Sequence, residues 1–148
     1  MERLDWDIEF EIPGEPQALK RHRSFKMGDR ISQYDPSKGD KADFLAKVMQ
    51  HKPDIPFDEP LYLKLGFYFS RPKGHYGTGK NAGKLKASAP EYHTKVPDSD
   101  NLTKFVCDSL NKVFWRDDSI IAALNVTKKY TDRPRITVKV YRILKPRK

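Results

Sequence analysis

Acidic residues are concentrated in one stretch, Val96 to Ser119, which reads VPDSDNLTKFVCDSLNKVFWRDDS and holds five aspartates. Asp98 and Asp100 are separated by one residue, and Asp117 and Asp118 are adjacent. A helix start needs only one capping side chain, and two neighbouring carboxylates repel each other unless a cation lies between them. Carboxylate oxygens in this arrangement suit Mg²⁺ or Mn²⁺, which keep several waters and bind through one or two carboxylates and a substrate phosphate.

Apolar residues between the two acidic pairs recur with helical spacing, which predicts a helix from Asn101 to about Lys112 with Asp100 as its N-cap. These apolar residues are Leu102, Phe105, Val106, Leu110 and Val113. On the opposite face, at about 100° per residue, Lys104 and Asp108 follow Asp100. Lys104 could stabilise the charge that develops on a phosphate, although a plain surface lysine is the alternative. For Asp108 an ordinary i, i+4 charge pair is the preferred interpretation.

The chain as a whole is basic, with 29 Lys and Arg against 20 Asp and Glu and a formal net charge of +9. The positive charge is clustered, because residues 71–95 carry six Lys or Arg and one acid, and residues 128–148 carry nine and one. Basic flanks favour a polyanionic partner, since each neutralised phosphate releases counterions. Two acidic pairs between such flanks are what metal-dependent cleavage of a phosphodiester requires.

Several other kinds of site are excluded by their patterns. Gly74 to Asn81, GHYGTGKN, is similar to a phosphate-binding P-loop, but Asn81 replaces the Ser or Thr that holds magnesium and no helix is expected to follow. We therefore expect no nucleotide cofactor. The lone Cys107 cannot form an internal disulfide, and the four histidines lack zinc-ligand spacing. No apolar run approaches the roughly 20 residues that span a bilayer and no signal-peptide core opens the chain, so we expect a cytoplasmic protein with no membrane partner.

The hydrophobic pattern predicts an α+β fold in a single domain over residues 1–148. Strict alternation of apolar and polar residues predicts strands at 8–12 and 60–70. A helix is expected from Pro36 to about Gln50, with a narrow apolar stripe. The members of that stripe are Ala42, Leu45, Ala46 and Met49.

The last two strands, 120–126 and 136–140, are expected to pair as a β-hairpin across a turn at 131–134. The basic segment 15–34 shows no clear period and is expected to be irregular. Residues 71–95 are expected to form a long basic loop, either a mobile binding loop or a disordered connection. The resulting order, β-α-β-α-β-β, predicts a mixed sheet with two helices packed on one face.

Pro97 to Ile121, PDSDNLTKFVCDSLNKVFWRDDSII, resembles the signature of the RusA family of Holliday-junction resolvases. That signature reads roughly P-D-x-D-N-L-x-K, then D-A-L-N, an aromatic residue, and D-D before an apolar strand. Ile12 to Arg23, IPGEPQALKRHR, is similar to the family's opening strand, Pro-rich turn and basic segment. The Lys-rich loop before the motif is similar to that of phage-encoded members, which leaves a phage or prophage origin open. Two positions depart from the pattern: Lys112 replaces a common helix-ending glycine, and Val96 replaces a basic residue.

The resemblance implies a homodimeric, magnesium-dependent RusA-like endodeoxyribonuclease, with manganese as a substitute metal, that resolves four-way branched DNA by paired symmetric nicks. By motif position it implies Asp98, Asp100 and Asp118 as catalytic, metal-holding carboxylates and Lys104 as the catalytic lysine. Asp117 receives no role. The residues expected to hold the DNA arms are Lys20, Arg21, Arg23, Arg71, Lys73, Lys80, Lys84 and Lys86.

One geometric question is left open by the sequence. A helix of twelve residues is about 18 Å long, so Asp118, beyond its far end, does not automatically approach Asp98. Either the chain between Phe114 and Asp118 doubles back along the helix, or a partner subunit contributes across a two-fold axis. Two alternative functions also stay open, a non-catalytic basic DNA-binding protein and a related nuclease acting on flaps or replication forks.

Overall fold

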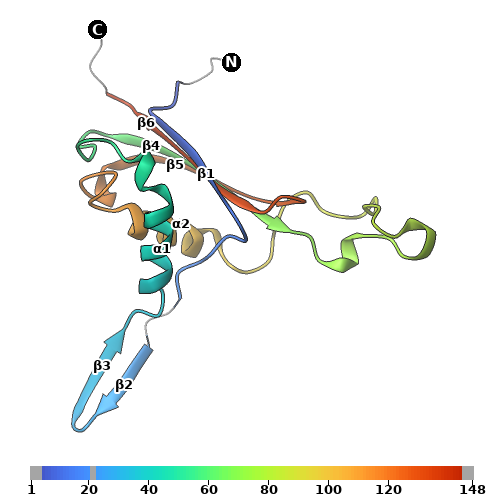
Figure 1. Ribbon diagram of the computed structural model, residues 1–148, viewed down its shortest axis with the longest axis horizontal. Helices are drawn as coiled ribbons and strands as arrows, with labels where there is room; N and C mark the ends of the chain where they lie inside the picture. The colour runs from blue at the N-terminus through green and yellow to red at the C-terminus, as the bar shows by residue number, and fades with distance from the viewer. Residues whose placement is uncertain (1–4, 21–22, 145–148) are drawn as a thin grey trace.

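The strand that alternation predicts most clearly, β4 (Leu61–Ser70), lies inside a four-stranded mixed sheet (Figure 1). The computed structural model describes residues 5–20 and 23–144. The strand order across the sheet is β1–β6–β4–β5, where the other strands are β1 (Ile8–Pro13), β5 (Ile121–Thr131) and β6 (Arg135–Arg142). The α+β fold class predicted from the sequence is confirmed.

The expected hairpin between the last two strands is wrong, because β4 lies between them. β5 pairs with β4 in parallel, with Leu65 opposite Val126, whereas β6 pairs with the other edge of β4 in antiparallel, with Leu65 opposite Val138. The short turn after Thr131 therefore crosses the end of β4 instead of closing a hairpin. A central place gives β4, with its five apolar side chains on one face, a hydrogen-bonded neighbour on each side.

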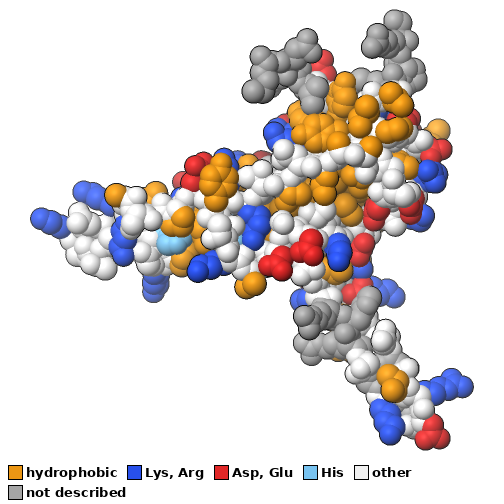
Figure 2. Space-filling model, turned by 180° about the vertical axis from the view of Figure 1, so that it is seen from behind, with side chains coloured by type: hydrophobic (Ala, Val, Ile, Leu, Met, Phe, Trp, Pro, Cys, Tyr) orange, Lys and Arg blue, Asp and Glu red, His pale blue; other side chains and the backbone are white. Residues whose placement is uncertain are grey.

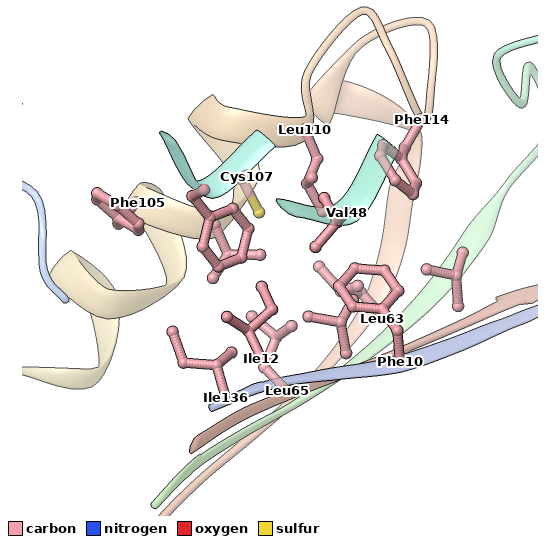
Figure 3. Packing of buried hydrophobic residues seen from close by; sticks show 14 of the residues in the cluster. Phe10, Ile12, Val48, Leu63, Leu65, Phe105, Cys107, Leu110, Phe114 and Ile136 are labelled. Atoms are coloured by element: carbon pink, nitrogen blue, oxygen red, sulfur yellow. The ribbon is translucent and has the colours of Figure 1, made fainter. Parts of the chain in front are cut away.

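Two helices, α1 (Lys38–Val48) and α2 (Ser99–Leu110), cover one face of the sheet, as expected. Figure 3 shows Leu110 of α2 and Val48 of α1 on the helix side of the core, with Leu63 and Leu65 of β4 below them. These side chains belong to one buried hydrophobic cluster that also includes residues of β1 and β6. Within the described residues, no helix is long and apolar enough to cross a bilayer.

The apolar stripe predicted for α1 is wrong in detail. Phe44 and Val48 are the buried side chains of this helix, while Ala42 and Ala46 are exposed and Met49 belongs to a following 3-10 turn, η1 (Met49–His51). Phe44 packs edge-on against Phe105, with ring centroids 5.5 Å apart. The larger side chains therefore determine which face of α1 is buried, since they remove more apolar area from water than alanines do.

Part of the basic segment expected to be irregular forms a second, separate sheet. β2 (Arg23–Met27) and β3 (Arg30–Tyr34) pair in antiparallel and project away from the main body (Figure 1). Gly28 has a φ of 61° in the turn between them, a value that glycine adopts without strain. The sequence did carry this signal, a Gly-Asp turn, but the strands beside it lack the apolar alternation that burial would impose.

The basic loop 71–95 projects from the sheet in another direction and is here called the arm (Figure 1). It contains two short 3-10 turns, η2 (Lys73–His75) and η3 (Gly79–Asn81), and Gly77 donates a backbone hydrogen bond to the carbonyl of Lys84. The arm therefore folds back on itself rather than running straight between elements.

The base of the arm is fastened to the end of the sheet. The backbone N–H of His93 donates to Lys128 O, and the backbone N–H of Tyr130 donates to Glu91 O, so the chain here extends the edge of β5. The ring of His93 is buried and stacks on Phe69 with centroids 3.9 Å apart. Burial, with the nearby Lys128 ammonium, lowers the pKa of His93 below its ordinary value.

This environment predicts a pH-dependent contribution of His93 to stability. A histidine whose pKa is lowered by folding contributes stability that is present above its unfolded pKa of about 6.5 and is lost as the pH falls through its folded pKa. His93→Phe keeps the stack without the titrating group, so the thermal midpoint of the variant should fall less than that of the parent between pH 7.5 and pH 5. Equal falls in the two proteins would contradict this role.

Candidate active site

The face of α2 that points away from the sheet carries two of the four predicted catalytic residues, Asp100 and Lys104. Leu102, Phe105 and Val106 are fully buried against the sheet, whereas Asp100 and Lys104 are exposed. The polar face predicted from the helical spacing is therefore confirmed. The predicted helix bounds need correction, because α2 begins at Ser99 and ends at Leu110.

The predicted N-cap also needs correction. Asp98, and not Asp100, occupies the capping position, and its side chain makes no capping hydrogen bond. Asp100 lies in the first turn of the helix, where the helix dipole favours a negative charge. Both carboxylates are exposed, and neither forms a hydrogen bond or ion pair with another residue in 5–20 or 23–144. Capping of the helix by a side-chain hydrogen bond therefore does not account for either carboxylate.

Lys128 of β5 lies close enough to Asp98 for their charges to interact. Burial lowers the pKa of Lys128, and the Asp98 carboxylate acts in the opposite direction. The ammonium donates a hydrogen bond of 2.7 Å to the backbone carbonyl of Lys95. Lys128 thus connects the start of α2 to the edge of the sheet, a position that sequence reasoning did not single out.

Asp118 lies at the other end of the site. It begins a 3-10 turn, η4 (Asp118–Ile120), is half-buried, and accepts a 2.7 Å hydrogen bond from the indole Nε1–H of Trp115. Burial raises its pKa, with smaller upward contributions from Asp108 and Asp117, and the Trp115 hydrogen bond opposes this. Trp115 itself is fully buried. Its spacing of three residues from Asp118 was the only sequence signal for this contact.

A shallow hollow beside α2 brings Lys104 and Asp118 to one surface. Its lining residues are Thr103, Lys104, Cys107, Asp108, Asp118, Ile121 and Leu124. The chain after α2 therefore does double back along the helix, as one of the two open alternatives required. Asp118 lies near the C-terminal half of α2, because the helix carboxylate that raises its pKa is that of Asp108.

Asp98 and Asp100 do not line this hollow. In the part of the chain that the structure describes, no group of three or more His, Cys, Asp or Glu residues is arranged to hold a metal ion. The exposed pair Asp98 and Asp100 is therefore the part of the described chain that suits a metal ion. Mg²⁺ binds proteins through one or two carboxylates and completes its coordination with phosphate oxygens and waters.

Two further groups beside the hollow have structural explanations. Asp108 lies 3.8 Å from the ammonium of Lys41 on α1, so its charge has a partner on the neighbouring helix and not the i, i+4 partner expected from the sequence. Burial, with Asp118 and Asp108 nearby, raises the pKa of the Cys107 thiol to about 12. Cys107 is therefore a protonated, unreactive core residue at neutral pH.

Asp117, which the sequence left without a role, shapes the turn that carries Asp118. Its Oδ2 accepts a hydrogen bond of 3.0 Å from the backbone N–H of Ser119, and its Oδ1 lies 3.2 Å from the ammonium of Lys112. These contacts, led by that from Ser119, lower the pKa of Asp117 to about 2. Asp117 therefore remains a carboxylate that fixes η4 at any pH near neutrality.

Lys112 occupies the position where the family signature commonly has glycine, and it has a φ of 71°. The left-handed conformation that glycine would adopt is thus kept by a residue with a Cβ, which costs about 1–2 kcal/mol. Replacing the signature's glycine with Lys112 therefore adds backbone strain to this turn, but the turn still forms.

This strain makes a measurable prediction. Lys112→Gly and Lys112→Ala both remove the contact with Asp117, but only glycine relieves the left-handed backbone. Lys112→Gly should therefore exceed Lys112→Ala in free energy of unfolding by about 1 kcal/mol, measured by urea denaturation. If the alanine variant proved equally stable, the strained conformation would be disproved.

The described basic residues that were expected to bind DNA lie on the arm, on the segment that leads into the β2–β3 hairpin, or at the start of that hairpin. Lys73, Lys80, Lys84 and Lys86 are exposed along the arm, and Figure 2 shows Lys and Arg side chains spread over its outer part. Arg71 has a structural task at the base of the arm, where its guanidinium donates to Pro90 O at 2.6 Å. On the segment before the hairpin, Lys20 lies 3.3 Å from Asp40. Arg23 begins β2, and Arg21 lies outside the described residues.

An α+β domain that presents paired carboxylates and a lysine between basic projections has the features of a metal-dependent nuclease. The sequence profile of the family Endodeoxyribonuclease RusA matches residues 13–141. The chain therefore belongs to the RusA family and is an endodeoxyribonuclease. Nucleases of this family are generally metal-dependent.

Two relatives align over almost the whole chain. An uncharacterized protein of Bacillus subtilis (strain 168), YqaN, is 32% identical over 135 residues, which cover 90% of this chain and 94% of the relative. A protein of Lactococcus phage r1t named crossover junction endodeoxyribonuclease rusA is 26% identical over 140 residues, 93% of this chain and 98% of the relative. A phage relative is consistent with the phage or prophage origin left open above.

Proposed function

We propose that this protein is a magnesium-dependent, structure-specific endonuclease that resolves four-way DNA junctions by paired symmetric nicks. The observation that carries the proposal is the pair of exposed carboxylates at the start of α2, Asp98 and Asp100, with Lys104 one turn further along the same exposed face. The name of the lactococcal phage relative, crossover junction endodeoxyribonuclease, supports the same substrate.

The metal would be held by Asp98 and Asp100. Asp118, which lies apart from this pair in the hollow beside α2, would join them as a third carboxylate only once DNA or a second subunit completes the site. Neither of the first two carboxylates forms a hydrogen bond or an ion pair within the described residues, and only Asp98 has a cationic side chain, that of Lys128, near enough for their charges to interact. A cation between the two carboxylates would therefore offset their repulsion. Bound Mg²⁺ supplies a lowered pKa for an attacking water and charge stabilisation for the leaving oxygen. Manganese would substitute because it also accepts six oxygen ligands.

The protein's own groups orient the substrate and its charge. The ammonium of Lys104 would stabilise the negative charge of the scissile phosphate in the transition state, at a position already set by the helix. The indole of Trp115 fixes one oxygen of Asp118, leaving the other oxygen of that carboxylate for a ligand.

The arm and the hairpin would hold the DNA by its phosphates. The arm residues Lys73, Lys80, Lys84 and Lys86 are exposed, and they carry no ion pair within residues 5–20 and 23–144. Contacts of this kind position a duplex without reading its sequence. Two projections at different angles suit two arms of a branched molecule better than one straight duplex.

A homodimer follows from the proposed substrate. A four-way junction has strands related by a two-fold axis, and two equal sites related by the same symmetry would nick both. Because Asp98 and Asp100 do not share the hollow with Asp118 within one chain, a second subunit could complete the site. Light scattering of the protein with and without junction DNA measures this state.

Neutralising one carboxylate of the pair is the direct test. Asp100→Asn should lower the rate of symmetric nicking of a synthetic junction in Mg²⁺ by about a hundredfold or more, because a metal ligand is lost while the shape is kept. Junction binding should survive or tighten, since one negative charge near the phosphates is removed. Asp43→Asn, the same change at an exposed aspartate on α1, is the matched control and should leave nicking unaltered.

Retained nicking by Asp100→Asn would eliminate the metal-site hypothesis. Binding without any nicking by the parent protein would favour the non-catalytic DNA-binding alternative. Comparing junction, flap, fork and linear duplex substrates separates a junction resolvase from a related flap or fork nuclease, because only the former should nick two strands of like polarity at symmetric positions.

A further inference from the structure

The β2–β3 hairpin is the part of the structure that the proposed catalytic site does not explain. The two strands pair with each other and with no strand of the main sheet, and they extend away from the body (Figure 1). An isolated two-stranded ribbon is marginally stable in water. We therefore expect contact with a bound ligand to stabilise this ribbon.

The root of the hairpin is fixed beside the proposed metal-binding pair. The backbone N–H of Leu19 donates to Asn101 O at 3.1 Å, one residue after Asp100. The backbone N–H of Lys20 donates to the hydroxyl oxygen of Ser37 at 2.8 Å, and Ser37 is fully buried. The chain that leads into the hairpin is thus tied to α2 and to the residue before α1, so the hairpin begins beside the helix that carries the proposed metal-binding pair.

The described side chains of the hairpin combine positive charge with an exposed apolar group. Ile31 is 76% exposed and lies directly opposite Lys26 in the antiparallel register, so the two share one face. Arg30 is exposed at the start of β3, and Asp29 in the turn is the one acid between Arg23 and Tyr34. Figure 2 shows hydrophobic atoms uncovered beside Lys or Arg side chains near the end of this projection.

This combination selects the kind of partner. Net positive charge complements a phosphate backbone and opposes binding to another copy of this basic chain. A two-stranded ribbon is narrow enough for a DNA groove, and apolar side chains that enter between bases stabilise unstacked steps. At a branch point the stacking of the duplex is already interrupted, so inserting an isoleucine there costs less than in a continuous duplex.

We propose that the β2–β3 hairpin recognises the branch point, with Lys26 and Arg30 contacting phosphates and Ile31 packing against a base unstacked at the crossover. The inference rests on the proposed junction substrate, because the hairpin begins beside the site that would cut the junction. It assigns to Ile31 a role in selecting branched over linear DNA, separate from the metal-dependent chemistry.

The test compares Ile31→Ser with Ile55→Ser. Ile55 is 79% exposed in a loop of the main body, so it offers the same change at the same exposure away from the hairpin. Binding is measured in EDTA to a junction carrying 2-aminopurine at the crossover and to a linear duplex of the same length. Parent protein and Ile55→Ser should raise the 2-aminopurine fluorescence on binding.

Ile31→Ser should lose that fluorescence rise and bind the junction about tenfold more weakly, with unchanged affinity for the linear duplex. Equal fluorescence and affinity for Ile31→Ser and Ile55→Ser would overturn the inference. Loss of self-association by Ile31→Ser in light scattering would also overturn it, by assigning the hairpin to a second copy. These readings need no nicking, so a parent that shows the Ile31 effect but never nicks in Mg²⁺ would refute the proposed chemistry alone.

Discussion

The burial of one face of α2 against the sheet is the contact on which the site depends. Leu102, Phe105, Val106 and Leu110 have no exposed surface. Side chains of this size contribute about 1.5–3 kcal/mol each when removed from water. The helix therefore cannot rotate without exposing them, and its opposite face, with Asp100 and Lys104, must point outward. A site that must meet a bulky polyanion needs this rigidity, because its charges have to be in place before the substrate arrives.

Three parts of the chain meet where α2 begins. The arm leaves the end of β4, is fastened to β5 through His93 and leads directly into the helix. The hairpin is tied to the same end through the hydrogen bond from Leu19 to Asn101. The central place of β4 makes this convergence possible, since the strand that starts the arm and the strand that anchors it are neighbours in the sheet. The acidic pair thus lies where two basic projections originate, which explains why a basic protein concentrates its acids in this stretch.

The elements that the sequence predicted well are those whose burial leaves a strict period. The alternation of Leu61 to Phe69 and the helical spacing of Leu102 to Leu110 are imposed by one buried face, and both were confirmed. Lys112 keeps a left-handed conformation at the position where the family signature commonly has a helix-ending glycine, an outcome that the sequence analysis did not predict.

The predictions that failed concern features whose local sequence pattern is compatible with two different structures. The alternating strands on either side of residues 131–134 suit a hairpin or two strands that flank a third, and only the whole sheet decides between them. The hairpin β2–β3 belongs to a separate two-stranded sheet, and its sequence lacks the strict apolar alternation that packing against a core imposes. The contact between Trp115 and Asp118 depends on how the chain turns after α2, which no spacing fixes.

The central claim is that a divalent cation is held at the start of α2, between the two basic projections that would bind DNA, the arm and the β2–β3 hairpin. The most direct measurement is anomalous diffraction at the manganese edge from crystals of the protein grown with a four-way junction and soaked in Mn²⁺. We expect an anomalous peak within coordination distance of the carboxylates of Asp98 and Asp100 and of a junction phosphate. Manganese that occupies other sites while these two carboxylates remain without a metal would contradict the claim.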